Sequence, residues 1–185
     1  MALAPHWGLP SRPLTYDDLQ ELPDDGRRYE LVDGTLLVAP APNLAHQRCV
    51  LHLGSLLDAA APRHLEVFVA PVDWRVSHQT VFEPDVLVVE AGANGTYLSR
   101  TPLLIVEVLS PSTAMVDRTT KRAAYEGAGV SAYWIVDPDA PSLTALRLRN
   151  GRYATDTMVE GNDEYRTDFP FPVAVVPSRL LHQQS

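Results

Sequence analysis

Two short apolar runs, Val86–Val89 and Leu103–Leu109, constrain the fold of this 185-residue chain more than any other feature. Their length and lack of alternation are typical of central strands that are buried on both faces. The pattern becomes helical over residues 117–128 and returns to that of a strand at Ala132–Val136. A strand, a helix and a strand in this order form a right-handed crossover between parallel strands. The sequence therefore predicts an α/β fold.

Turn and capping residues predict the elements around this crossover. Asp33-Gly34 and Asn150-Gly151 each lie between two strand-like segments, which indicates two tight β-hairpins. Asn43 can cap a helix that extends to about Ala61. The apolar residues of this segment recur at helical spacing, so one face of the helix is expected to pack on the core.

Composition excludes several classes of protein. Cys49 is the only cysteine, which rules out a disulfide framework and a cysteine-based structural zinc site and fits a reducing cytoplasm. No apolar run approaches the roughly 18 residues of a membrane-spanning helix, and residues 1–18 lack a basic start followed by an apolar stretch. We therefore expect a cytoplasmic protein without a membrane partner, with a loose arm over residues 1–14 and a single domain over residues 15–185.

The charge pattern limits the ways in which this chain could bind nucleic acid. A formal net charge of −8 argues against binding through bulk positive charge, because such proteins neutralise phosphates with lysine and arginine. The net charge does not exclude a local basic groove or a metal site. Of the 15 basic residues, Lys121 is the only lysine. Codon usage that favours arginine explains this bias, but the one lysine that is kept differs chemically from arginine and lies on the predicted crossover helix.

Glu107 is the most unusual residue, because it lies inside the apolar run 103–109. A carboxylate at a buried position must be paired, protonated or bound to a metal. Asp85 follows Pro84 at the start of the other run, and two acids on adjacent central strands can hold one hard divalent cation through oxygen ligands. The alternatives are an edge-facing or salt-bridged acid for Glu107 and a strand-start cap for Asp85.

Three further residues could join this pair of acids. Lys121 lies on a partly apolar helix face and could reach the strand that carries Glu107; the alternative is a solvated lysine paired with Asp117. Glu30 has apolar neighbours and could point inward, or it could be a polar position on a hairpin strand. His46 begins the apolar face of its helix, where a packing residue is a simpler interpretation than a ligand.

Together these residues resemble the PD-(D/E)xK nuclease pattern, and the chain is similar to the Uma-two family of restriction endonucleases over about Thr15 to Leu148. The stretch Val106–Asp137 carries the most specific part of the resemblance. The matching segments are Tyr29–Gly34, His46-Gln47, Pro84–Val86, Val106–Thr113, Asp117, Lys121, Tyr125–Val130, Tyr133-Trp134 and Val136–Pro138.

The resemblance implies a restriction-endonuclease-like core, with a mixed central sheet flanked by helices and with added β-hairpins. It implies that Asp85 and Glu107 bind Mg²⁺ or Mn²⁺, with the Val108 carbonyl as a further ligand. Lys121 would be the catalytic lysine, displaced onto the helix. The position two residues after Glu107, where the superfamily usually carries its lysine, is Leu109 in this chain.

The implied function is that of an endonuclease that hydrolyses DNA phosphodiester bonds. A bound metal ion polarises the phosphate and lowers the pKa of an attacking water molecule. A nearby lysine can orient that water or stabilise developing charge. Glu30 would be an auxiliary acid, and His46 is a second candidate for an auxiliary role.

A non-catalytic DNA- or protein-binding module on the same fold is the alternative function. The acidic net charge favours it slightly, because an acidic surface repels DNA. A homodimer is compatible with an enzyme that cuts two strands. Arg118 and Arg122 flank Lys121 and could contact phosphates, as could Arg27 and Arg28. The alternative is that these are ordinary surface arginines paired with acids, which we favour for Arg27 and Arg28.

Overall fold

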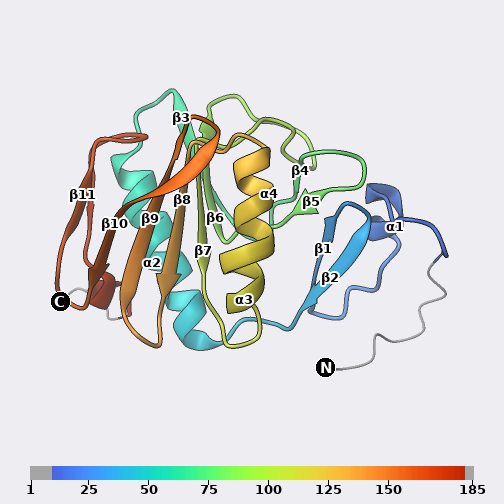
Figure 1. Ribbon diagram of the computed structural model, residues 1–185, viewed down its shortest axis with the longest axis horizontal. Coiled ribbons are helices and arrows are strands. Elements are labelled where there is room, and N and C mark those ends of the chain that lie inside the picture. The colour runs from blue at the N-terminus through green and yellow to red at the C-terminus, as the bar shows by residue number, and fades with distance from the viewer. Residues whose placement is uncertain (1–9, 182–185) are drawn as a thin grey trace.

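A computed structural model describes residues 10–181 of the chain, and a mixed sheet lies at its centre (Figure 1). β7 and β8 are parallel, whereas the other neighbouring strands of this sheet are antiparallel. In spatial order, the six strands that the described residues form are β10 (Arg152–Glu160), β9 (Ser142–Arg149), β8 (Ala132–Asp137), β7 (Leu104–Val108), β6 (Val86–Glu90) and β3 (Leu65–Val69).

A continuous helical segment connects β7 to the parallel strand β8. It consists of α3 (Ala114–Val116), the π-helical turn η1 (Asp117–Lys121) and α4 (Arg122–Gly127). This segment is the crossover that the sequence predicts. The expected fold class, an α/β fold with a mixed central sheet flanked by helices and with added hairpins, is confirmed.

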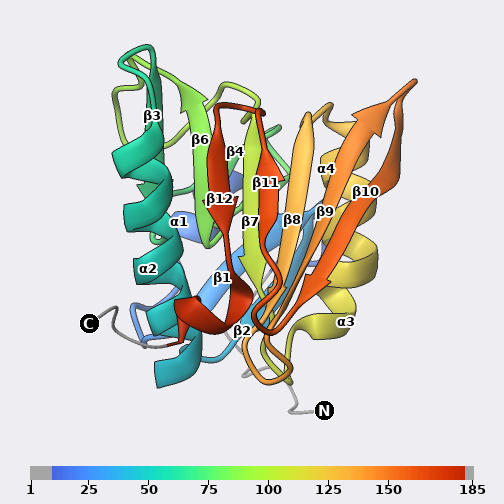
Figure 2. The same cartoon turned by 90° about the vertical axis from the view of Figure 1, so that its left-hand side faces the viewer.

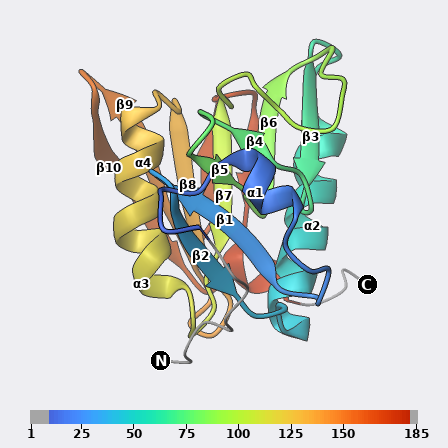
Figure 3. The same cartoon turned by 90° about the vertical axis from the view of Figure 1, so that its right-hand side faces the viewer.

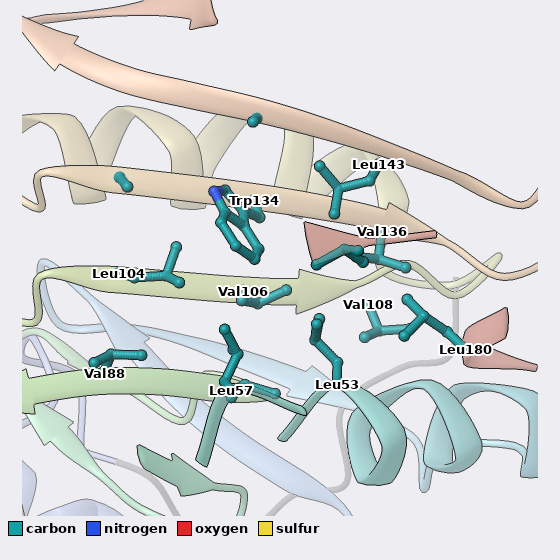
Figure 4. Packing of buried hydrophobic residues seen from close by; sticks show 14 of the residues in the cluster. Leu53, Leu57, Val88, Leu104, Val106, Val108, Trp134, Val136, Leu143 and Leu180 are labelled. Atoms are coloured by element: carbon teal, nitrogen blue, oxygen red, sulfur yellow. The ribbon is translucent and has the colours of Figure 1, made fainter. Parts of the chain in front are cut away.

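Helices cover both faces of the sheet, which lies between α2 (Leu44–Ala60) and α4 (Figure 3). The side chains of β7 alternate between the two faces, as they do in any strand. Leu104, Val106 and Val108 pack in one cluster with Leu53 and Leu57 of α2 (Figure 4). The intervening residues of β7 point to the opposite face, where a second cluster includes residues of α4.

A second, four-stranded sheet lies beside the first, at the right in Figure 1. The β1–β2 and β9–β10 hairpins turn at the expected dipeptides, and both residues of each dipeptide have positive φ. The angles are 48° and 76° at Asp33-Gly34 and 52° and 76° at Asn150-Gly151. Aspartate, asparagine and glycine tolerate these angles best, which is why both dipeptides favour a tight hairpin. In order, the strands of this sheet are β2 (Thr35–Ala39), β1 (Arg28–Val32), β5 (Val81–Phe82) and β4 (Trp74–Arg75).

Smaller elements complete the described part of the chain. α1 (Tyr16–Gln20) precedes the second sheet, and Thr15 caps the N-terminus of this helix. β11 (Tyr165–Thr167) and β12 (Val173–Val175) pair with each other on the α2 side of the main sheet (Figure 2). η2 (Pro177–Leu180) follows them. No helix within residues 10–181 is long and apolar enough to span a membrane.

The expected N-terminal arm, residues 1–14, falls largely outside the described residues, which begin at residue 10. The looseness of the arm stays a prediction, although its last residue contacts the domain. Leu14 is buried beside Leu31, and its N–H donates to the Gly34 carbonyl at 2.9 Å. Burial of this apolar side chain outweighs the conformational freedom that irregular, proline-rich sequence suggests. The extent of the domain, residues 15–185, stays a prediction.

Replacing Leu53 by alanine should lower the free energy of unfolding by about 2–5 kcal/mol, because a fully buried leucine packs α2 onto the sheet. Leu51 is 63% exposed on the same helix, so Leu51→Ala is a matched control that should change stability by less than about 0.5 kcal/mol. Urea unfolding followed by circular dichroism measures both variants. Equal losses would contradict this packing of α2.

Candidate active site

A cavity of about 260 Å³ lies between the β1–β2 hairpin, the first turn of α2, the end of β7 and the helical segment α3–η1. The fold brings together in its walls every residue that the sequence suggests for a metal-binding or catalytic role. Arg118 and Arg122, the suggested phosphate contacts, lie outside the cavity and are exposed. The predicted site residues in the walls are Glu30, His46, Asp85, Glu107, Val108 and Lys121.

Glu107 lies on the central strand β7 and faces α4, because its neighbours Val106 and Val108 face α2. Its Oε1 accepts hydrogen bonds from the Lys121 ammonium at 3.0 Å and from the Tyr125 hydroxyl at 2.6 Å. Burial raises the pKa of Glu107 well above its usual value, although the charge of Lys121 opposes the rise. Glu107 is thus a salt-bridged acid at the centre of the sheet and not at an edge.

Lys121 is a buried cation and not the solvated helix lysine that the sequence left open. Its Nζ lies 2.9 Å from Glu30 Oε2, 3.0 Å from Glu107 Oε1 and 3.6 Å from Asp117 Oδ1. Burial alone would lower the pKa of Lys121, but the surrounding carboxylates outweigh burial and raise it. Lys121 therefore stays protonated at neutral pH. It can supply positive charge and hydrogen bonds, but it cannot act as a base.

The π-helical turn η1 brings Asp117, Lys121 and Tyr125 to the same side of the helical segment. In an α-helix, residues four apart are rotated by about 40°, so three residues at this spacing would drift by about 80° around the axis. A π-helical turn contains about one residue more than an α-helical turn. Side chains four residues apart therefore point in more nearly the same direction. The Tyr133 hydroxyl donates to the Asp117 carbonyl at 3.0 Å and so satisfies a buried oxygen of this turn.

Asp85, at the start of β6, is the second buried acid. Its Oδ2 accepts the backbone N–H of Val108 at 2.8 Å and contacts His46 Nε2 at 3.1 Å, while Oδ1 accepts Arg28 Nη1 at 2.8 Å. Burial alone would raise the pKa of Asp85, but the hydrogen bond with His46 and the charge of Arg28 lower it well below its usual value. Asp85 is thus ionised at neutral pH and bonded to the neighbouring strand β7.

The N-terminal cap of α2 positions His46. Asn43 Oδ1 accepts the backbone N–H of His46 at 2.9 Å, which places the first turn of the helix at the cavity. The imidazole is buried, and it contacts Asp85 as described above. His46 therefore links the start of α2 to Asp85. This contact goes beyond the packing role that was the simpler interpretation of the sequence.

Arg28 and Glu30 lie two residues apart in β1 and share one face of the strand. Arg28 pairs with Asp85 and, through Nε, with Glu83 at 2.7 Å, so it is not the surface arginine that we favoured from the sequence. Glu30 points inward, where it accepts the backbone N–H of Glu83 at 2.8 Å as well as the Lys121 ammonium. The spacing of two residues from Glu30 was the signal that could have placed Arg28 in the site.

Acidic side chains outnumber the permanent cations in the lining of the cavity. Among the described residues that line it, four are carboxylates and two, Arg28 and Lys121, are permanent cations. Asp117 Oδ1 is buried without a hydrogen bond. Buried carboxyl oxygens of this kind fit a hard divalent cation. No three His, Cys, Asp or Glu side chains of the described residues form a complete metal site, but Mg²⁺ usually takes one or two carboxylates together with water and phosphate oxygens.

Tyr125→Phe should lower the free energy of unfolding by about 1–3 kcal/mol, because it removes a buried donor to the Glu107 carboxylate and keeps the packed ring. Tyr29→Phe removes an exposed hydroxyl that donates to Asp25, and it should cost less than about 0.5 kcal/mol. Chemical denaturation of both variants at pH 7 provides the comparison. Indistinguishable stabilities would mean that the bond between Tyr125 and Glu107 is not formed.

Comparison with known proteins places the chain in a family. Residues 16–175 match the family model of Uma2, described as "Putative restriction endonuclease". The chain is similar to a solved structure from Anabaena variabilis ATCC 29413, described as "a putative nuclease belonging to DUF820", with a TM-score of 0.68 and 19% identity over 82% of this chain and 87% of that chain. This likeness shows a shared fold, in agreement with the expected mixed α/β core. No curated protein matches the chain. Because the family match spans most of its length, the chain belongs to the Uma2 family.

Proposed function

We propose that this protein is a metal-dependent endonuclease that hydrolyses DNA phosphodiester bonds. Membership of the Uma2 family supports a nuclease-like function. The observation that carries the finer assignment is the contact between Lys121 and Glu107, because it brings the chain's one lysine from the helix to a buried acid. Leu109, at the usual position of the superfamily lysine, is apolar and buried. Lys121 therefore supplies from the helix the charge that Leu109 cannot supply.

Asp85 and Glu107 are the residues that would hold Mg²⁺ or Mn²⁺, with the Val108 carbonyl as a further ligand. A bound divalent cation polarises a phosphate and lowers the pKa of a water molecule. Asp85 is already ionised at neutral pH, whereas burial raises the pKa of Glu107, so a proton competes with a cation for Glu107 at a higher pH than for Asp85. Metal binding is therefore linked to the release of a proton from the site.

The other polar residues of the cavity either stabilise charge on a bound phosphate or hold neighbouring side chains in position. Lys121 stays protonated and can donate to a phosphate oxygen, where an electrostatic contact of this kind contributes about 3 kcal/mol to the transition state. Glu30 holds the Lys121 ammonium in place as an auxiliary acid, and Tyr125 orients Glu107. Arg28 orients Asp85 and adds a second positive charge to the cavity.

A non-catalytic DNA- or protein-binding module on the same fold is the second candidate. The net charge of −8 favours it, because an acidic surface weakens association with a polyanion. Such a module would keep the buried ion pairs for stability and would not turn over a substrate. A homodimer, a cytoplasmic location and an auxiliary catalytic role for His46 stay predictions.

Cleavage of DNA tests the proposed activity. With Mg²⁺ or Mn²⁺, the wild-type protein should cut supercoiled plasmid or single-stranded DNA, and chelation of the metal should stop the reaction. Lys121→Ala and Glu107→Gln should each lose about 100-fold or more in rate, since each removes a charge that acts on the reacting phosphate or its metal. Glu160→Gln, at an exposed position of β10, is the matched control and should keep the wild-type rate. Full activity of Lys121→Ala would refute the role of Lys121.

Metal binding can be measured apart from turnover. Titration calorimetry with Mn²⁺ should show binding that strengthens as the pH rises, because the raised pKa of Glu107 makes a proton compete with the metal. Asp85→Asn and Glu107→Gln should each weaken binding by about 10-fold or more, the size of loss known for changes that disturb a metal site. In Glu107→Gln the pH dependence should also flatten. Unchanged binding in both variants would exclude the two acids as ligands.

A further inference from the structure

We propose that the cavity takes single-stranded DNA, and that the bound strand leaves it across exposed arginines of the helical segment. This inference rests on the proposed nuclease function and names the substrate class of the same site. It is carried by the depth of the cavity, by the apolar side chains in its walls and by a group of arginines beside it.

The groups that would act on the phosphate lie in a deep recess. Asp85 and Glu107 are each 1% exposed and Lys121 is 4% exposed, in a cavity of about 260 Å³. Duplex DNA is stiff, with a persistence length of about 50 nm, and its phosphates lie on the outside of stacked base pairs. A duplex cannot lower one phosphate into such a recess without losing its stacking, whereas a single strand can bend at each nucleotide. The recess therefore favours an unpaired strand.

Apolar side chains form much of the cavity wall. Val38 and Pro40 line it on the β1–β2 side, and Pro111 and Val116 line it on the side of the helical segment. Apolar side chains can contact the face of an unpaired base, whereas the faces of paired bases are already stacked in a duplex. These walls thus match the sugar and base of an unpaired nucleotide better than they match a row of phosphates.

Beside the cavity, a shallow surface hollow of about 430 Å³ contains Arg118, Arg122 and Arg152, and we call it the arginine hollow. Arg118 directly follows Asp117, which lines the cavity, so the hollow lies on the helical segment that also forms one wall of the cavity. Arg152 joins from the start of β10, whose sheet lies behind α4 in Figure 1. A strand that leaves the cavity on this side would pass three guanidinium groups.

The ion pairs of these arginines leave them available to a phosphate. Arg152 pairs with Glu126 at 3.0 Å and Arg118 pairs with Asp137 at 3.7 Å, with 86% and 52% of the arginine side chains exposed. Exposed pairs of this kind contribute only about 0–1 kcal/mol each, so exchanging a carboxylate for a phosphate costs little. The arginine hollow can therefore follow the backbone of a bound strand.

The net charge of the protein points to the same substrate. Duplex DNA carries one negative charge per about 1.7 Å of its axis, twice the density of one strand. With a net charge of −8, the protein repels a duplex more strongly than it repels a single strand. A short row of arginines can offset the weaker repulsion.

One oligonucleotide sequence in three forms tests the substrate class: a single strand, a blunt duplex, and a duplex with a single-stranded extension. We expect the single strand and the extension to be cut at least about 10-fold faster than the paired regions, the ratio expected when one base must be unstacked. Equal or faster cutting of the blunt duplex would overturn this assignment and leave the nuclease function standing. If no form is cut, the nuclease function fails, and the substrate class is then tested by the binding affinities of Glu107→Gln for the three forms. About 10-fold tighter binding of the single strand supports the assignment. Equal binding of the three forms overturns it.

Binding of the single strand by Glu107→Gln at several salt concentrations tests the path. Adding Arg122→Gln or Arg152→Gln should weaken binding and lower the slope of log K against log salt by about 0.7, the value for one lost phosphate contact with a single strand. Arg149→Gln is the matched control, because Arg149 is 67% exposed on the same hairpin and pairs with Asp156, but does not line the hollow. A loss in Arg149→Gln as large as in the other two variants would refute a defined path across the hollow.

Discussion

The buried ammonium of Lys121 is the interaction on which the rest of the structure depends. Its carboxylate partners Glu30, Glu107 and Asp117 belong to β1, β7 and η1, so one charge holds the hairpin, the main sheet and the crossover together. Removing one partner of a buried ion pair typically costs about 3–5 kcal/mol. The elements that enclose the cavity therefore cannot separate without leaving a buried charge uncompensated, and the position of the candidate catalytic lysine is set by the stability of the fold itself.

Asp85 and Glu107 are equally buried, and their surroundings nevertheless shift their pKa values in opposite directions. Asp85 faces Arg28 and accepts the backbone N–H of Val108, so its ionised form is favoured. Glu107 lies among other acids, and the charge of Lys121 only partly offsets its burial. Acids whose pKa values are driven apart by their environment are typical of sites that bind metals or move protons.

Local patterns were sufficient for much of the fold and for the identity of the central acid. The apolar runs predicted β6 and β7, the helical pattern after them predicted the crossover, and two dipeptides that tolerate positive φ predicted the hairpins. Glu107 stood out because a carboxylate in an apolar run requires a partner. Arg28 was misjudged as a surface residue, because its partner Asp85 is distant in the chain and only the spacing of two residues from Glu30 pointed to the site.

The sequence by itself determined the fold class, the positions of the hairpin turns and which acids had to be unusual, because these properties depend on the periodicity of side chains and on the torsional preferences of single residues. Only the tertiary structure decided that Lys121 contacts Glu107, that Glu30 points inward and that Arg28 pairs with Asp85. These contacts join residues on separate elements, and those of Lys121 also depend on a π-helical turn whose widened hydrogen bonding no spacing rule predicts. The physical reason is that charges are placed by the packing of whole elements, whereas strands and turns form from local preferences.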